Sequence, residues 1–400
     1  MNYGLPYQGS KSKICEELIN QLPNASTFVD LFAGGCAMID IAMRSAKYSH
    51  YIANDIAEAP LLFRDAINGE YANETRWISR EDFKALKDSD PYVRICWSFG
   101  NNQAQYMYSR EIEPWKKALH YARVFGDCSL LCEFDIESNG SRADIVKHHD
   151  EYKQKYIRWW LAQQEYTAQE LDTLIATTRD DIRKTEEELR QYLLDALADS
   201  GLTQAEVGKR LGTQMQGHYF GRSQWAFPTQ EYYEQMQTFM PKLDQDYNEI
   251  VGLYHLQQSL QRLERLESLE RLESLQSLQR LQRLQSLQSL QRLEVYRGDY
   301  RKVRISADSV IYCDIPYKGT AGYTTEFDHK AFYEWAKAQE QVVYVSEYAM
   351  PSDWVCVWRK TINRKFSATS HSECHEGLFV HATKLAQYEA NMRVSQGSLF

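Results

Sequence analysis

The stretch TFVDLFAGGC, residues 27–36, decides the fold of this chain. A short apolar run leads into two glycines, and a second apolar stretch covers residues 37–44. This order predicts a strand, a glycine turn and a helix. Glycines allow a ligand to approach the backbone, and a helix N-terminus favours an anionic group. The stretch therefore predicts an α/β fold with a ligand site at the end of this strand.

A second strand is expected at residues 50–53, and it ends in Asn54-Asp55. An acidic residue about 20 positions beyond a glycine turn, at the tip of the next strand, is placed to bind ribose hydroxyls. The two segments together indicate a nucleoside-containing cofactor. Many doubly wound proteins carry this pattern, so by itself it predicts a doubly wound (Rossmann-like) fold rather than one activity.

A third strand is expected at residues 309–313, and it runs directly into Asp314-Ile315-Pro316-Tyr317. The Asp314 carboxylate and the Ile315 carbonyl can accept hydrogen bonds from the exocyclic amine of a flat heterocycle. Such hydrogen bonds direct the nitrogen lone pair out of the ring and toward an electrophile. Pro316 fixes the backbone, and Tyr317 can stack on a base. These four residues are the predicted catalytic group.

These segments, together with Tyr7-Gln8-Gly9-Ser10-Lys11, resemble motifs of the Dam-type adenine-specific DNA methyltransferases. The tetrapeptide resembles the Asp-Pro-Pro-Tyr signature of that family, with Ile315 in place of the first proline. The resemblance implies that the lysine-bearing segment and the glycine loop bind the methionine part of S-adenosylmethionine, and that the acidic residue after the second strand binds its ribose. Gly298-Asp299-Tyr300 resembles the family segment near the cofactor adenine. The predicted cofactor-binding residues are Tyr7, Gly9, Lys11, Asp30, Phe32, Ala33, Gly34, Gly35, Asp55, Asp299 and Tyr300.

The resemblance covers roughly residues 3–120 and 294–381, including the segments 344–348 and 364–380. It implies transfer of a methyl group from S-adenosylmethionine to the 6-amino group of adenine in duplex DNA, after the base is flipped out of the helix. No covalent intermediate is needed, and no Pro-Cys nucleophile is apparent. Two alternatives stay open: methylation of the 4-amino group of cytosine, and a DNA-binding regulator with a decayed catalytic fold.

The net charge of −9 does not exclude a DNA partner, because DNA affinity depends on local clusters of Lys and Arg. The sequence contains no run of about 18 apolar residues, so it predicts no transmembrane helix. The eight cysteines contain no Cys-x-x-Cys pair, which indicates reduced thiols and a cytoplasmic protein. His371 to His375 holds metal-capable side chains, but without a second cluster we expect no metal site.

A helix-turn-helix is expected near residues 190–226. Thr203 and Glu206 form a capping-box pattern that opens a short helix, and Gly212 ends it. The second helix of such a motif normally enters the major groove. The predicted DNA-contacting residues are Gln214, His218, Arg222 and Gln224, with Asn101 in the polar loop 98–102 as a further candidate.

Leucine occupies every third position from Leu260 to Leu293, with only Gln, Glu, Arg and Ser between. The composition favours a helix of about 51 Å. Because three residues advance about 300° around a helix, the leucines circle it and no single face is apolar. The repeat could then be covered by neighbours, self-associate, form a solenoid or act as a spacer.

The expected architecture is an α/β catalytic domain assembled from both ends of the chain. Residues 1–75 and 294–400 form this domain, 76–255 form a mainly helical target-recognition insertion, and 256–293 form the leucine-repeat segment.

Overall fold

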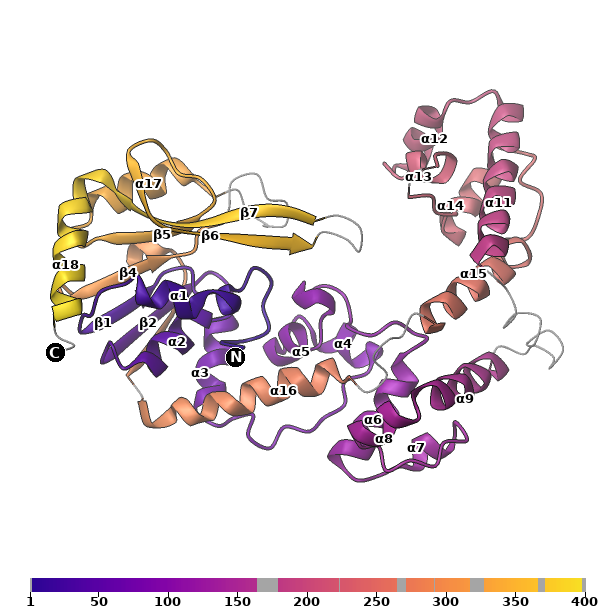
Figure 1. The fold of residues 1–400 in the computed structure, drawn as a ribbon. Helices are drawn as coiled ribbons and strands as arrows, with labels where there is room; N and C mark the ends of the chain where they lie inside the picture. Colours follow the sequence, from indigo (N-terminus) through magenta and orange to yellow (C-terminus); the bar gives the residue numbers. More distant parts are fainter. Residues whose placement is uncertain are drawn as a thin grey trace. The chain divides into compact units, whose positions relative to one another are not determined.

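The structure, a computed structural model, describes residues 2–163, 179–222, 224–264, 271–290, 292–316, 327–365 and 371–397. It contains a seven-stranded sheet. Its strand order is β3-β2-β1-β4-β5-β7-β6. The first five strands are parallel, whereas β7 runs antiparallel to both β5 and β6 (Figure 1). The strands are β1 (Thr27–Asp30), β2 (His50–Asp55), β3 (Leu293–Arg297), β4 (Ser309–Cys313), β5 (Val343–Glu347), β6 (Trp354–Lys365) and β7 (His371–His381). The predicted α/β class is confirmed, as a mostly parallel sheet with an antiparallel hairpin at one edge.

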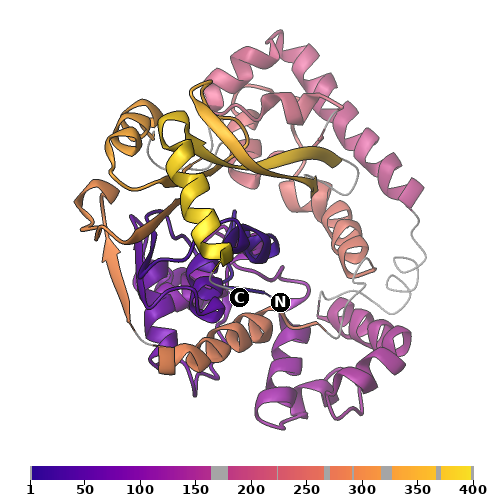
Figure 2. The same ribbon diagram turned by 60° about the vertical axis from the view of Figure 1, so that its left-hand side comes forward.

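Helices cover both faces of the central strands. Val29 of β1 and Ile311 of β4 pack with Phe332 of α17 (His329–Ala338) in one buried cluster. Side chains alternate between faces along a strand. Tyr344 of β5 accordingly faces the other way and packs against Tyr388 of α18 (Leu385–Gly397), at 6.0 Å between ring centroids. The C-terminal helix α18 is yellow in Figure 2. The central strands β1, β4 and β5 are therefore buried on both faces, which fits their near-continuous apolar sequences.

The chain divides into two compact units, one formed by Met1–Tyr108 with Leu272–Phe400 and the other by Ser109–Arg271. We call them the sheet unit and the helical unit. Besides the elements above, the sheet unit holds η1 (Lys11–Lys13), α1 (Cys15–Asn20), α2 (Ala37–Ser45), α3 (Ala59–Ile67), α4 (Arg80–Leu86), α5 (Pro91–Cys96), η2 (Phe99–Asn101), α16 (Glu273–Leu284), η3 (Gln285–Leu290), η4 (Tyr300–Lys302) and η5 (Ala382–Lys384). The helical unit holds α6 (Glu113–Val124), α7 (Ser129–Cys132), α8 (Arg142–Lys147), α9 (His149–Ala162), α11 (Arg179–Ser200), α12 (Gln204–Leu211), α13 (Gln216–Phe220), α14 (Gln230–Gln237) and α15 (Tyr247–Glu264).

The predicted helix start at Thr203 is confirmed. The Thr203 side chain accepts from the Glu206 amide and the Glu206 carboxylate accepts from the Thr203 amide, which is a full capping box. Gly212 ends α12 in a left-handed conformation with φ +64°. Helices α12 and α13 then pack closely, because a Cβ on Gly208 would lie 2.6 Å from the Gln216 side chain. The turn between two helices that the sequence predicts is therefore present.

The tyrosines of α9 lie in the core of the helical unit. Tyr156 is buried, and its ring lies 5.4 Å from that of Trp115 and 5.0 Å from that of Phe134. The Tyr156 hydroxyl donates to the Glu111 carbonyl at 2.7 Å. Its polar tip is thus satisfied inside the protein, and it is not available to stack on a base.

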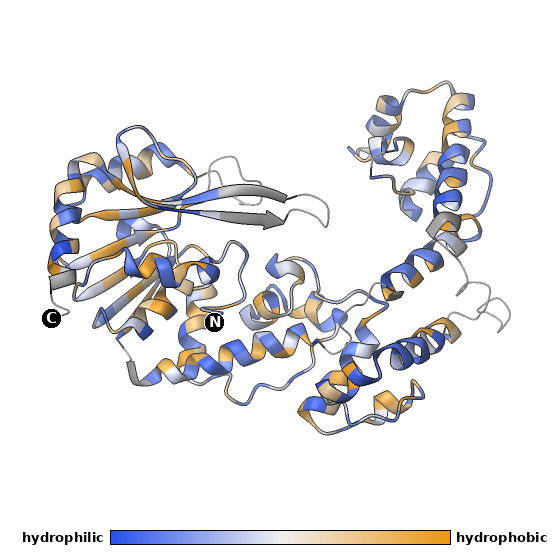
Figure 3. Cartoon of the chain, in the orientation of Figure 1, coloured by the Kyte–Doolittle hydropathy of each residue, from blue (hydrophilic) through white to orange (hydrophobic). Residues whose placement is uncertain are grey.

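The prediction of a single helix over the leucine repeat is wrong. Leu272 has extended backbone angles, φ −120° and ψ 99°, and Leu293 begins strand β3. Between them lie α16 and η3, where apolar and polar residues alternate along the chain (Figure 3). Leu278, Leu281 and Leu284 of α16 are buried. Because the leucine stripe moves around the helix, a short helix can bury it on one broad side, whereas a long one would expose it.

Candidate active site

Three acidic residues lie at the carboxyl ends of neighbouring parallel strands. Asp30 is the last residue of β1, Asp55 is the last of β2, and Asp314 follows β4 directly. Asp30 is in register with Ala53 of β2 and Tyr312 of β4. Carboxyl ends of parallel strands meet at one edge, where open α/β sheets bind their ligands. The fold therefore brings three of the predicted site residues to one edge of the sheet.

Lys11 forms an ion pair with Asp314. Its Nζ donates to Oδ1 and Oδ2 of the carboxylate, at 2.7 Å each, across 303 positions of sequence. The lysine is 8% exposed and the aspartate 21% exposed. Lys11 opens η1, whose N-cap Ser10 accepts a hydrogen bond from the Ser12 amide. The lysine-bearing segment and the Asp314 tetrapeptide, read separately in the sequence, thus meet at one contact.

Glu376 and Ser346 complete this group, and the sequence analysis did not select them. Glu376 Oε1 lies 3.7 Å from Lys11 Nζ and accepts from the Ser346 hydroxyl at 2.8 Å. Glu376 is 2% exposed and Ser346 is fully buried. The sequence signal that could have identified Glu376 is its place beside the apolar run Leu378–Val380. An acidic residue next to a buried strand is expected to be buried itself and to need a partner. Two carboxylates therefore flank one lysine.

The glycine loop after β1 is held by backbone and carboxylate contacts. The Ala33 amide donates to the Asn54 carbonyl at 2.9 Å, and the Gly34 amide donates to Asp55 Oδ2 at 2.8 Å. A Cβ on Gly35 would lie 2.5 Å from Cβ of Tyr7, so only glycine fits there. The loop thus joins predicted cofactor residues from three separate segments.

Burial raises the pKa of Asp30 well above its usual range, and the nearby Asp314 charge raises it further. Asp30 is 2% exposed, and its Oδ1 accepts from the Phe32 amide at 3.3 Å. Burial also raises the pKa of Asp55, although hydrogen bonds from the Ala57 and Gly34 amides oppose this. Burial disfavours the charged form of both carboxyl groups. Burial also limits their contact with water, so few water molecules would compete with a cationic or hydroxyl-bearing ligand for their oxygens.

Asn54 links the end of β2 to the segment that carries Asp299 and Tyr300. Its side-chain amide donates to the Leu31 carbonyl at 2.9 Å and to the Gly298 carbonyl at 3.2 Å. Asn54 is 2% exposed, and the Gly298 amide donates to the Asp55 carbonyl at 2.9 Å. Asn54 is not among the predicted site residues, yet its side chain holds the segment at Gly298 against the end of β2.

An aromatic cluster lies beside the glycine loop. The ring of Phe32 is 5.2 Å from that of Tyr300 and 5.7 Å from that of Phe332. Tyr300 also contacts Trp335 edge to face, at 4.9 Å. Asp299 caps η4 and forms an ion pair with Arg301, whose hydrogen bond holds the pKa of Asp299 below its usual value. Phe32 and Tyr300 are thus together, whereas the Asp299 carboxylate is engaged by a neighbouring cation.

The tetrapeptide after β4 is described only in part. Ile315 is buried, and the Pro316 carbonyl oxygen lies 2.8 Å from Nε2 of His329. Tyr317 lies outside the described residues. Gly9 has a φ of +77° and nothing within 4 Å of a Cβ built on it.

The predicted DNA-contacting residues fall in both units. Gln214, His218, Arg222 and Gln224 lie on or after α12 and α13 and are exposed or half-buried. His218 Nδ1 lies 3.1 Å from the Gln224 carbonyl, and Arg222 pairs with Glu187 at 3.3 Å. Asn101 belongs to the sheet unit, in the η2 loop, with a φ of +59°.

Within the described ranges, no three His, Cys, Asp or Glu side chains lie close enough together to hold a metal ion. The helices of the same ranges include none that is both long and apolar enough to cross a lipid bilayer.

Comparison with known proteins identifies a protein family. The family model described as D12 class N6 adenine-specific DNA methyltransferase matches residues 7–242, which is more than half of the chain. No curated protein matches the sequence. The matched range includes Lys11, the glycine loop, Asp55 and the segment of α12 and α13, and it ends before the leucine repeat and Asp314.

Proposed function

Because the chain belongs to the D12 class of N6 adenine-specific DNA methyltransferases, we propose that the edge of the sheet around Lys11, Asp30, Asp55 and Asp314 is its active site. The protein transfers a methyl group from S-adenosylmethionine to the 6-amino group of adenine in DNA. The family assignment favours this activity over cytosine methylation and over a decayed regulator. The observation that supports the assignment of the site is the ion pair between Lys11 and Asp314, which joins the cofactor segment to the catalytic strand.

We propose that Asp314 and the Ile315 carbonyl accept hydrogen bonds from the adenine amine. This directs the nitrogen lone pair toward the methyl group. When bound, S-adenosylmethionine would supply the methyl group to this nitrogen, with the sulfur keeping the electrons of the broken S–C bond and the amine losing one proton to water. Lys11 holds both oxygens of Asp314 at 2.7 Å, which fixes the orientation of the carboxylate. The protein acts here mainly by positioning.

The residues around the glycine loop fit S-adenosylmethionine. Gly35 lets Tyr7 pack directly against the glycine loop, because a Cβ there would lie 2.5 Å from Cβ of Tyr7. The Asp55 carboxylate, already held by the Gly34 amide, keeps lone pairs for ribose hydroxyls. Asp30 offers a buried acceptor for a cationic group, and the Phe32–Tyr300 pair offers an aromatic wall. When bound, S-adenosylmethionine supplies the activated methyl group; the proposed roles of these residues require no metal.

We propose that DNA recognition uses the region 76–255, with Gln214, Arg222 and Gln224 as contacts to duplex DNA. Support comes from the capped helix pair α12 and α13, which resembles a helix-turn-helix. Self-association through the leucine repeat finds no support in the described part, because Leu278 and Leu281 are buried within the sheet unit.

The test is transfer of tritium from labelled S-adenosylmethionine to unmethylated duplex DNA, followed by nucleoside analysis. The wild type should label 6-methyladenine. Asp314→Ala should abolish transfer while S-adenosylmethionine still binds, because the substitution removes an acceptor for the amine and leaves the glycine loop intact. Asp88→Ala, at an exposed aspartate of the same unit, should transfer at the wild-type rate. Loss of cofactor binding in Asp314→Ala would contradict the assigned role.

A further inference from the structure

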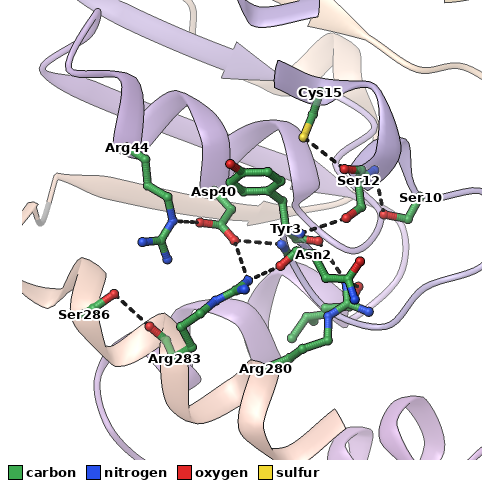
Figure 4. Close-up of polar contacts among 12 residues, drawn as sticks. Asn2, Tyr3, Ser10, Ser12, Cys15, Asp40, Arg44, Arg280, Arg283 and Ser286 are labelled. Atoms are coloured by element: carbon green, nitrogen blue, oxygen red, sulfur yellow. Dashed lines mark hydrogen bonds and ion pairs between the residues drawn. The ribbon is translucent and has the colours of Figure 1, made fainter. Parts of the chain in front are cut away.

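The second half of the leucine repeat contacts the very start of the chain. We call residues Asn2–Leu5 the N-terminal strap. Figure 4 shows Arg280 and Arg283 of α16 reaching this strap and Asp40 of α2. Arg283 donates to the Asn2 carbonyl, and Arg280 donates to the Tyr3 carbonyl at 2.9 Å. These contacts span more than 270 positions of sequence, so nothing local requires them.

The two arginines bind the strap differently. Arg280 uses one amino group to donate to both the Tyr3 and the Leu5 carbonyls, at 2.9 and 3.3 Å. Arg283 also lies 3.7 Å from the carboxylate of Asp40, which is fully buried. Asp40 in turn accepts from the Gly4 amide of the strap at 2.8 Å and pairs with Arg44 at 2.6 Å. The strap is therefore held through both its carbonyls and its amides.

The strap is in direct contact with the glycine loop. The Leu5 amide donates to the Gly35 carbonyl at 2.7 Å. Gly4 approaches so closely that a Cβ there would lie 2.3 Å from the Gly35 oxygen. A shift of the strap by even one ångström would break or compress these contacts. The position of the arginines on α16 thus bears on the position of the glycine loop.

The strap also fixes the lysine-bearing segment. The Tyr3 amide donates to the Ser12 hydroxyl at 2.7 Å, and the Tyr3 hydroxyl donates to Glu16 at 2.6 Å. Ser12 follows Lys11 in η1. The same short strap therefore contacts both segments that the proposed function assigns to S-adenosylmethionine.

Within α16, the third residue of a leucine triplet differs with its surroundings. Ser274 and Ser277 are buried, and the Ser274 hydroxyl accepts from Tyr108 at 3.0 Å. The next two triplets place Arg280 and Arg283 at the strap. The small serine side chains thus lie where α16 is buried, and the long arginine side chains lie where the strap carbonyls need hydrogen-bond donors. These contacts therefore fix the register of α16 in spite of its simple sequence.

We propose that Arg280 and Arg283 are positioning residues for S-adenosylmethionine binding, and that they act through the N-terminal strap on the glycine loop and on Lys11. The inference rests on the proposed function, because it assigns no new ligand to the site. It gives the second half of the repeat a role that a spacer does not have. Neither arginine touches the reacting atoms.

The test compares Arg280→Ala, Arg283→Ala and the double variant with Arg292→Ala. Arg292 is exposed and holds the same triplet position, so it is a matched control. The double variant should raise both Kd and KM for S-adenosylmethionine about tenfold, which is about 1.4 kcal/mol, with kcat within about twofold of wild type. Arg280→Lys should restore part of the affinity, because an ammonium can donate to one or both carbonyls. Arg292→Ala should bind like wild type.

A second variant tests the register at constant composition. Ser277→Arg with Arg280→Ser moves one arginine by one triplet and should weaken cofactor binding at least as much as Arg280→Ala. Should this variant not fold, the comparison between Arg280→Ala and Arg292→Ala still decides. The inference is overturned if the double arginine variant binds S-adenosylmethionine with wild-type Kd while Lys11→Met binds weakly. If Lys11→Met also keeps wild-type affinity, the proposed cofactor site fails as well.

Discussion

The ion pair between Lys11 and Asp314 predicts strong coupling between two substitutions. Asp314→Asn and Lys11→Met should each lower the free energy of unfolding, and the double variant should lose little more than either single one. Lys11 is 8% exposed, so a lone ammonium there would be poorly solvated. Removing one partner of a buried pair leaves the other charge uncompensated, whereas removing both does not.

The magnitude follows from the burial of the two groups. Breaking a buried pair costs about 3–5 kcal/mol. Asp314 is 21% exposed, and Glu376 lies 3.7 Å from the Lys11 ammonium, so each single substitution should cost about 3 kcal/mol, at the low end of that range. With both charges removed, the cost of an unpaired charge falls away. If the double variant also costs about 3 kcal/mol, the coupling free energy is about 3 kcal/mol.

Urea denaturation of the four proteins at neutral pH measures this coupling. The surface pair of Lys360 with Glu17, in the same unit, is the control cycle, because these side chains are 34% and 49% exposed. Exposed pairs contribute about 0–1 kcal/mol. A coupling between Lys11 and Asp314 no larger than that of the control would refute the reasoning, since it would mean that the two groups do not share a desolvated contact.

Three further predictions follow from burial and backbone geometry. Burial raises the pKa of Asp30 above its unfolded value, so the stability that Asp30 contributes is full below the unfolded pKa and is lost as pH rises through the folded pKa. The Asp30→Asn variant should therefore be more stable than wild type at neutral pH. If urea denaturation gave the two proteins the same pH dependence of stability, this prediction would be wrong. Gly4→Ala, which puts Cβ 2.3 Å from the Gly35 oxygen, should lower Tm far more than Gly9→Ala, where nothing lies within 4 Å, and equal melting shifts would argue against the strap contact. Thr203→Ala should cost about 1 kcal/mol by calorimetry through the lost cap while Thr203→Ser costs less, and equal losses would count against the capping box.

Local patterns predicted the local features well. The strand and glycine turn at residues 27–35, the strand at 309–313 and the capped helix from Gln204 to Leu211 were all read from the sequence and are present. Each depends on interactions within a few residues, such as the reciprocal hydrogen bonds of Thr203 and Glu206. Such features need no knowledge of distant parts of the chain.

The leucine repeat was predicted poorly for a physical reason. Its period of three gives no fixed apolar face, so the local pattern does not define which side of a helix is buried. The buried side of the helix is instead determined by contacts with distant residues. The Tyr108 hydroxyl donates to the Ser274 hydroxyl, and Arg280 donates to the Tyr3 carbonyl of the strap. Glu376 was missed for the same reason, because its partners Ser346 and Lys11 come from other segments.

The sequence by itself determined which chemical groups stand at the ends of the strands: Asp30, Asp55, Asp314 and the glycines between them. Only the tertiary structure decided which of them meet. Strand β4 lies next to β1 although some 280 residues separate them in the chain, and this places Asp314 beside Lys11. Strand order and helix docking depend on burying apolar surface over the whole unit, and that requirement cannot be read from any short window of sequence.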